Sequence, residues 1–176
     1  MPGAGKSTAS MGLVASGWER VVMGDVVREE TRRRGLEPNA RNTGEVMKDL
    51  RRSMGEAAVA KLSLERVSQA GAEKVVVDGI RSVAEVDEFR KAGRTLLIVV
   101  HASPRRRFEL LKERGRSDDP LSVDMFLERD RRELGVGIGS AIALADEVVS
   151  NERNTPRGLS EDTMAAVNRW LKADAQ

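Results

Sequence analysis

Residues 2–8 read Pro-Gly-Ala-Gly-Lys-Ser-Thr, a spacing that is typical of a loop wrapped around phosphate groups. Gly3 and Gly5 lack a Cβ, so the backbone can turn with positive φ and approach a ligand closely. Successive N–H groups then face one concavity, and the amino end of the following helix adds positive potential. Lys6 would reach the β- and γ-phosphates and Ser7 would ligate Mg²⁺. This stretch predicts a site for ATP with Mg²⁺ at Pro2, Gly3, Ala4, Gly5, Lys6, Ser7 and Thr8.

Acidic and basic residues follow two of the short β-branched runs, which predict strands at residues 20–23, 74–77, 95–100 and 147–149. Unbroken apolar runs are typical of parallel strands buried on both faces, and ligands bind at the carboxyl ends of such strands. Asp25 and Arg28 follow the first run, and Asp78 and Arg81 follow the second. We expect Asp78 to hold Mg²⁺ together with Ser7. The two arginines would clamp a second phosphate and neutralise charge in the transition state.

Each of these four residues also has an ordinary structural interpretation. Asp25 could cap a helix, and Asp78 could be a turn residue before Gly79. Arg28 and Arg81 could be solvated surface charges. Their coincidence at one sheet edge favours a site. The arginine runs at residues 32–34 and 105–107 are, in contrast, interpreted as solvated helix faces.

Helical segments alternate with the strands, which predicts a three-layer α/β fold in one domain, residues 1–176. Helices should begin after Ser82, at Ser103-Pro104, and near Ser122 and Ser160, and should end at Gly71, Gly93 and Gly115. Glu85 would complete a capping box with Ser82. The span 26–71 is too long for one crossover helix and predicts a helical insertion of three helices. The span 115–139 predicts a lid.

Composition narrows the class of protein. The chain has no run of about 18 apolar residues, so no membrane span is expected. It has no cysteine, which fits a cytoplasmic location. Basic and acidic residues are nearly balanced, 30 against 28, and only 3% of residues are aromatic. Both observations count against a nucleic-acid partner.

These motifs together resemble P-loop nucleoside monophosphate kinases and dephospho-coenzyme A kinase. The likeness is closer to an archaeal family of P-loop proteins described as dephospho-coenzyme A kinase-related, and it runs nearly end to end. It implies that Asp25, Arg28 and Arg81 bind the acceptor, that the helical insertion at 26–71 contributes to acceptor binding, and that Asn151 lies near the adenine. It also implies that the lid contributes Arg114, Arg116, Arg129 and Arg132. Leu110 departs from the pattern, because the kinases usually carry an ATP-stacking arginine there.

The resemblance implies transfer of the γ-phosphoryl group of Mg-ATP to a nucleoside monophosphate or dephospho-coenzyme A type of acceptor. Lys6, Asp25, Arg81 and Arg116 are the candidate catalytic residues, and Arg114 would contact ATP. Asp25 would serve as general base only for a hydroxyl acceptor. The alternative is a P-loop ATPase or nucleotide switch that acts with an RNA or protein partner.

The beginning of the chain raises one further expectation. The first glycine of the phosphate-loop pattern would stand one position before Met1. In folds of this type, the strand that leads into the loop lies in the middle of the sheet. We therefore expect about five to ten upstream residues that form an apolar strand ending in glycine, with Met1 inside the loop. Without this strand the chain should bind ATP poorly and melt early.

Overall fold

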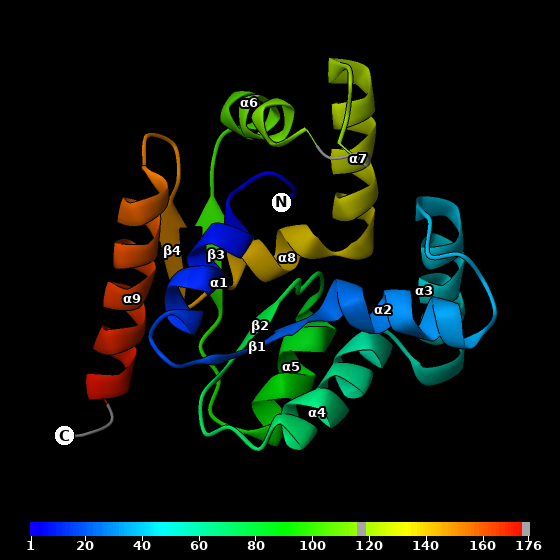
Figure 1. The fold of residues 1–176 in the computed structure, drawn as a ribbon, viewed down its shortest axis with the longest axis horizontal. Helices are drawn as coiled ribbons and strands as arrows, with labels where there is room; N and C mark the ends of the chain where they lie inside the picture. Colours follow the sequence, from blue (N-terminus) through cyan, green and yellow to red (C-terminus); the bar gives the residue numbers. More distant parts are fainter. Residues whose placement is uncertain (116–118, 174–176) are drawn as a thin grey trace.

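The computed structural model describes residues 1–115 and 119–173, and it shows an α/β fold with parallel strands (Figure 1). Within these residues, four strands alternate with helical segments. In order, the described elements are α1 (Lys6–Val14), β1 (Glu19–Val22), α2 (Met23–Arg33), α3 (Ala40–Met54), α4 (Ala58–Ala70), β2 (Val75–Asp78), α5 (Val83–Ala92), β3 (Ile98–His101), α6 (Pro104–Arg114), α7 (Val123–Val136), α8 (Ile138–Ala143), β4 (Glu147–Ser150) and α9 (Pro156–Ala173).

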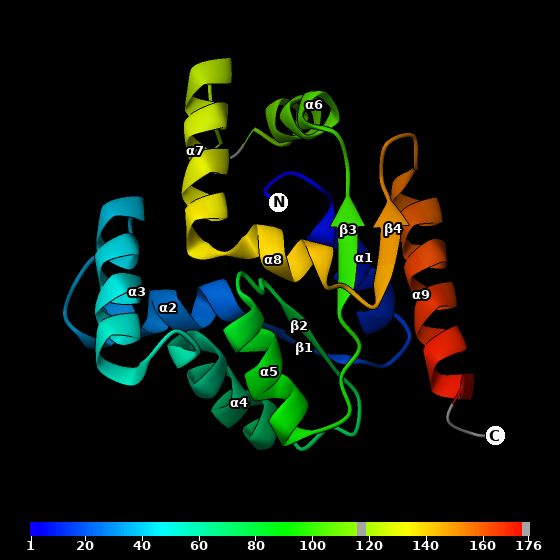
Figure 2. The ribbon, with the colours of Figure 1, turned by 180° about the vertical axis from the view of Figure 1, so that it is seen from behind.

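The strands pair in parallel, but as two separate pairs. β1 pairs with β2, so that Glu19 lies opposite Val75, and β3 pairs with β4, so that Ile98 lies opposite Glu147. All four predicted strands are present, although Met23 opens α2 instead of ending β1, and β3 begins at Ile98 instead of Thr95. Helices cover the pairs on both sides: α1 and α9 pack together on one face, and α4, α5 and α8 lie on the other (Figures 1 and 2). The predicted three-layer arrangement is confirmed.

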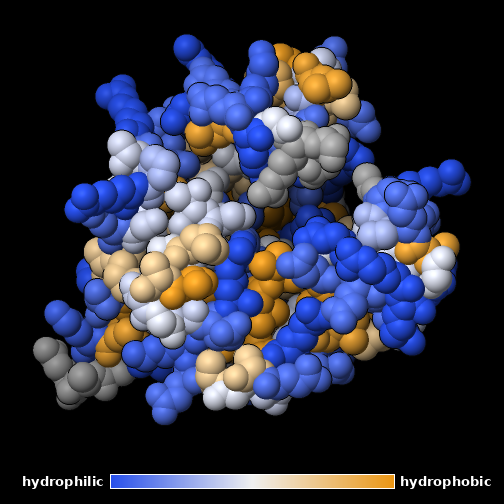
Figure 3. Space-filling view, in the orientation of Figure 1, coloured by the Kyte–Doolittle hydropathy of each residue, from blue (hydrophilic) through white to orange (hydrophobic). Residues whose placement is uncertain are grey.

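The hydrophobic core is divided in the same way as the strands. One buried cluster joins α2, α3 and α4 to Phe89, and the other joins α1, β3, β4 and α9 around Leu159. Apolar residues remain visible toward the middle of the face in Figure 3, inside a hydrophilic rim. Val75, Val76 and Val77 of β2 are only half-buried, against the expectation of burial on both faces. The reason is that, within residues 1–115 and 119–173, β2 has a neighbouring strand on one edge only.

Several helices begin at a side-chain cap. The hydroxyl groups of Ser82, Ser103 and Ser122 accept hydrogen bonds from main-chain N–H groups three residues on, as predicted. The start near Ser160 is wrong, because α9 begins at Pro156, where the Thr155 hydroxyl accepts from the Gly158 N–H at 3.0 Å. Thr155-Pro156 thus repeats the pairing of a cap and proline seen at Ser103-Pro104.

The two predicted excursions also have defined structures. The span 26–71 contains most of α2 and all of α3 and α4, with breaks at Gly35 and Gly55. The span 115–139 contains α7 and leads into α8, which the sequence pattern did not predict. Within residues 1–115 and 119–173, no helix combines the length and the apolar character needed to cross a bilayer.

Candidate nucleotide-binding site

The loop before α1 has the backbone that the motif predicts. Gly3 has φ +77° and Gly5, which caps α1, has φ +100°. A Cβ at Gly3 would lie 2.7 Å from the Arg107 carbonyl oxygen, and a Cβ at Gly5 would lie 2.5 Å from the Asn151 amide nitrogen. Conformation and space therefore both require glycine at these two positions.

Two side chains donate hydrogen bonds to main-chain carbonyl groups of the loop. The Asn151 amide donates a hydrogen bond to the Ala4 carbonyl at 3.0 Å, and Arg107 Nη1 donates to the Pro2 carbonyl at 3.1 Å. Asn151 is buried at the end of β4, so the side chain predicted to lie near the adenine has a main-chain partner in the loop. This contact joins the end of β4 to the main chain of the loop.

Arg107 corrects the interpretation of residues 105–107 as a solvated face. Its side chain is buried, pairs with Asp130 of α7 at 2.8 Å and lies over the Phe126 ring. Arg105 of the same run stays exposed. Burial of the guanidinium is possible because Asp130 neutralises its charge and the Pro2 carbonyl takes a further hydrogen bond. The resulting contact joins α6, α7 and the phosphate loop.

The Lys6 side chain contacts the main chain of the loop. Its Nζ donates to the Met1 carbonyl at 2.9 Å. Burial lowers the pKa of Lys6, and the nearby carboxylates of Asp78 and Glu133 act in the opposite direction. An ammonium group that has lost its water gains more from a phosphate oxygen than a solvated one would.

Ser7 and Asp78, the predicted metal ligands, lie side by side. The Ser7 hydroxyl donates to Asp78 Oδ2 at 3.3 Å, across the gap between α1 and the end of β2. Hydroxyl and carboxylate oxygens are ligands that Mg²⁺ accepts, with its other positions filled by phosphates and water. Among the described residues, no three histidine, cysteine or acidic side chains form a group that could hold a metal ion.

Arg20 is a site residue that the sequence reasoning missed. Its Nη2 donates to Asp78 Oδ2 at 2.6 Å, so the guanidinium fixes the carboxylate that faces Ser7. Its Nε is buried without a hydrogen-bond partner among the described residues. The available signal was an arginine inside the apolar run at residues 20–23.

The two acid–arginine motifs meet through their backbones. A Cβ at Gly79 would lie 3.5 Å from the Met23 Cβ, so the turn after β2 touches the start of α2. The side chains have separate partners: Arg28 pairs with Asp25, both exposed, whereas Arg81 Nε lies 3.4 Å from Glu133 Oε2. The contact of the turn with α2 brings the motifs to one edge, as predicted.

A buried carboxylate holds the turn that carries Arg81. Glu85 Oε2 accepts a hydrogen bond from the Arg81 main-chain N–H at 2.7 Å, and Glu85 Oε1 lies 3.3 Å from Arg51 of α3. The predicted capping box is therefore half formed, because Ser82 caps Glu85 while the Glu85 side chain turns to Arg81. Glu85 and Glu133 were both missed as site residues.

The four arginines predicted for the lid differ in their surroundings. Arg114 pairs with Asp119, whose side chain is buried, and Arg129 Nη1 lies 3.6 Å from the same carboxylate. Arg132 is exposed on α7. Arg116 lies outside the described residues.

Comparisons with known proteins place this site in a family. A family model described as an AAA domain matches residues 1–124. A UPF0200 protein of Methanocaldococcus jannaschii is 49% identical over 156 residues, which cover 88% of this chain and 79% of that protein. A UPF0200 protein of Methanosarcina mazei is 41% identical over 178 residues, which cover all of this chain and 95% of that protein.

A solved structure supports the fold. The crystal structure of TT1252 from Thermus thermophilus matches with a TM-score of 0.67 over 97% of this chain and 93% of that chain. Its sequence identity is 19%, so the likeness concerns the fold alone. The phosphate loop, the parallel strands and these matches define a P-loop nucleotide-binding domain with a kinase-like fold. The chain belongs to the UPF0200 family of archaeal P-loop proteins, with an AAA domain over residues 1–124.

Proposed function

We propose that this protein is a phosphotransferase that moves the γ-phosphoryl group of Mg-ATP to a small nucleotide-like acceptor. The observation that carries the proposal is the contact of Ser7 with Asp78 beside Lys6 and the loop. This pair supplies oxygen ligands for Mg²⁺, which neutralises phosphate charge when bound. Phosphoryl transfer depends mainly on such positioning and charge neutralisation.

Two arginines on different elements would bind the acceptor. Arg81, held by Glu85 through its main-chain N–H, lies at the end of β2, and Arg28 lies on the first turns of α2. Two guanidinium groups in this arrangement suit a phosphate or pyrophosphate group on the acceptor. The three helices α2, α3 and α4 would bind the rest of the acceptor.

The lid would close from α7. Arg114 and Arg129 both contact the Asp119 carboxylate. Bound phosphates would compete with that carboxylate, and both guanidinium groups would then turn toward the loop. Closure would exclude water, which otherwise hydrolyses ATP. Arg116 and Arg132 are proposed to complete this group.

The acceptor is tested by a screen. Nucleoside monophosphates and dephospho-coenzyme A are each added to Mg-ATP and the protein, and ADP release is followed. We expect one acceptor to accelerate ADP release, and we expect Arg28→Ala and Arg81→Ala to raise the KM for the acceptor more than that for ATP. ADP release that is indifferent to every acceptor but responds to RNA or a protein partner would instead support an ATPase or switch.

A further inference from the structure

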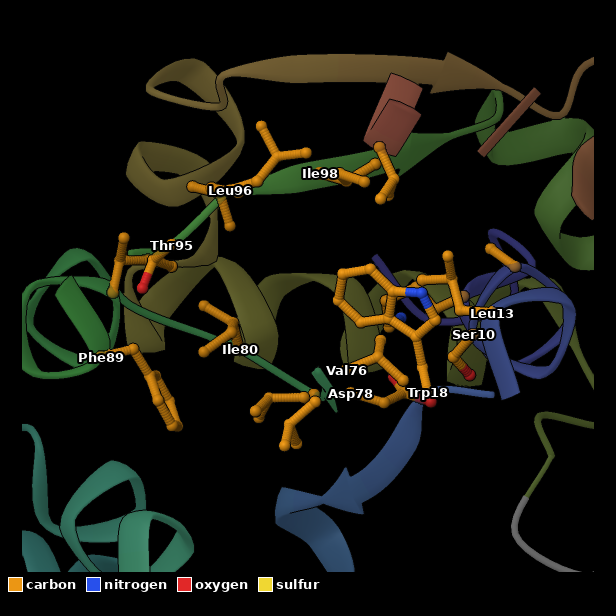
Figure 4. A pocket seen from close by; sticks show the side chains of 18 of the residues that line it. Ser10, Leu13, Trp18, Val76, Asp78, Ile80, Phe89, Thr95, Leu96 and Ile98 are labelled. Atoms are coloured by element: carbon orange, nitrogen blue, oxygen red, sulfur yellow. The ribbon is translucent and has the colours of Figure 1, made fainter. Parts of the chain in front are cut away.

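Apolar side chains gather in two places outside the two core clusters. One place is a cavity of about 480 Å³ between β2 and β3, where Val76 and Ile80 line one wall and Leu96 and Ile98 line the other (Figure 4). Side chains of α1, α5, α8 and α9 also border this cavity, so it lies within the layers of the fold. The other place is on the outside of the molecule, on and just before α7, where another macromolecule can reach it.

The segment from Leu121 to Leu134 carries half of the exposed large apolar side chains of the described residues. Ten such side chains are exposed, and five of them belong to this segment: Leu121, Val123, Met125, Leu127 and Leu134. Figures 1 and 2 show α7 at the margin of the molecule, and Figure 3 shows apolar atoms gathered over its upper end. Exposed apolar residues that stand singly need no explanation, whereas a group of them marks a contact surface.

Helical spacing places three of these side chains on one face of α7. Val123, Leu127 and Leu134 fall within about 40° of one another around the helix axis, because each residue advances by about 100°. Leu121, which is 87% exposed, precedes them in the chain. We call these four residues the α7 stripe. The adjacent face of the helix is anchored to α6 through the buried Asp130, so α7 is held by one face and presents the stripe on the next.

A row of two charges runs beside the α7 stripe. Asp124 and Arg131 are seven residues apart, so they lie on nearly the same line along the helix. Both are exposed, and neither has an ion-pair partner within residues 1–115 and 119–173. The row is acidic toward the amino end of α7 and basic toward its carboxyl end. A second copy of the same helix therefore complements the row when it runs antiparallel, whereas a parallel copy would bring like charges together.

We propose that the α7 stripe is a self-association surface, on which two copies of this chain pair through antiparallel α7 helices about a two-fold axis. The charges fix the register, because Asp124 then meets Arg131 of the partner subunit, and the symmetry repeats this pair. The apolar residues fit the same register: 121 and 134 have the same midpoint as 124 and 131, so Leu121 meets Leu134 of the partner subunit. Leu127 lies beside the axis.

The remaining residue of the stripe also finds a place in this register. Val123 falls, along the axis, between Leu127 and Leu134 of the partner subunit, which is how side chains of paired helices interdigitate. A different protein partner would place no such demand on the charge row, because the row would not have to complement itself. The agreement of charged and apolar residues on one register is the observation that selects a second copy as the occupant.

The length of the surface sets the strength of the association. Residues 121–134 span about 20 Å along the helix. Such a contact is smaller than a standard interface of about 800 Å² per partner. We therefore expect a Kd on the order of 10–100 μM, weaker than the μM to pM range of standard interfaces.

Cysteine cross-linking tests the register, because the chain has no cysteine of its own. Leu127→Cys places two thiols beside the axis, where the two Cα atoms are offset by only about 1.5 Å along the helix. Val123→Cys is the matched control on the same stripe, because its two copies are offset by about 13 Å, too far for a disulfide. We expect a disulfide-linked dimer from Leu127→Cys and at least about tenfold less from Val123→Cys. Equal linking of both variants would contradict the antiparallel register, and no linking of Leu127→Cys would overturn the proposal.

Charge reversal tests the same contact with the apolar stripe intact. Asp124→Arg and Arg131→Glu each bring like charges together twice, so each variant alone should raise Kd by at least about tenfold. An equimolar mixture of the two variants restores opposite charges and should associate like the unaltered chain. Arg105→Glu, which changes an exposed arginine of α6, is the control and should leave Kd unchanged.

Sedimentation equilibrium measures Kd, and circular dichroism with Tm shows that each variant is folded. Reversals that leave Kd unchanged, a mixture that stays monomeric, or an unaltered chain that is monomeric at about 500 μM would each overturn the proposal. None of these measurements involves nucleotide or an acceptor, so their outcome is independent of the proposed phosphoryl transfer.

Discussion

The Lys6 ammonium lies between a loop carbonyl and two carboxylates, in surroundings that lower its pKa by burial. Lys6→Ala is expected to reduce ADP formation by about 10²–10³-fold, as loss of one preorganised charge does at other transition states. Tm should change little, because the lost hydrogen bond is offset by removal of a buried charge. Lys48→Ala, which removes an exposed lysine paired with Glu45, is the control. Turnover near the wild-type rate in Lys6→Ala would show that the loop does not bind the reacting phosphates.

Asp25 reports on the class of acceptor. It is exposed and pairs with Arg28. If the acceptor is a hydroxyl group, Asp25→Asn should lower kcat by about 10²–10⁴-fold, because a general base is lost. If the acceptor is a phosphate, the loss should be mild. Glu29→Gln, on the same helix and paired with Arg66, is the matched control. A large loss with an acceptor shown to be a phosphate contradicts this division.

At the scale of elements, the ion pair of Arg107 with Asp130 joins α6, α7 and the phosphate loop. Removing one partner of a buried pair costs about 3–5 kcal/mol, so Asp130→Ala should lower the free energy of unfolding by about that amount. ATP affinity should fall as well, because Pro2 loses its fixed partner. Glu109→Ala, which frees the exposed Arg105, should cost less than about 1 kcal/mol. Denaturant unfolding and ATP titration measure both, and equal stability of the two variants would rule out this role for the pair.

Local sequence patterns predicted the helices and strands better than they predicted the residues of the candidate site. The phosphate loop, the four strands and the caps at Ser82, Ser103 and Ser122 depend on neighbouring residues, so their sequence signals are complete. The start of α9 was missed although Thr155-Pro156 carries the same signal.

The missed site residues depend on distant partners. The position of the Arg20 side chain is fixed by Asp78, which lies 58 residues away in the sequence. That of the Arg107 side chain is fixed by Asp130, which lies 23 residues away. Burial of an arginine needs such a carboxylate, and no spacing rule along the chain reveals it. Glu85 was assigned to a cap because its local position fits one, whereas the fold directs its side chain to Arg81.

At the scale of the whole molecule, the stability of this chain should depend on pH through the Met1 amino group. Burial lowers the pKa of its amino group from the ordinary 8.0 to about 5 in the folded chain, so the unfolded chain binds more protons between these values. Stability should therefore rise from pH 5 to pH 8, by on the order of 2–4 kcal/mol. The facing charges are Lys6, Arg107, Glu133 and Asp130. The control is the same chain acetylated at Met1, whose amino group cannot titrate. Subtracting its free energy of unfolding at each pH removes the contribution of the other titratable groups. An equal pH dependence in both forms would contradict the assignment to Met1.

The central claim is that this P-loop domain transfers phosphoryl groups to a small acceptor. ATP labelled in its γ-phosphoryl group tests it most directly, with the label traced after incubation with Mg²⁺, the chain and the acceptor found by the screen. We expect the label to appear on the acceptor, and Lys6→Ala to reduce this transfer by about 10²–10³-fold. Label recovered only as inorganic phosphate, with every acceptor in the screen, would contradict it.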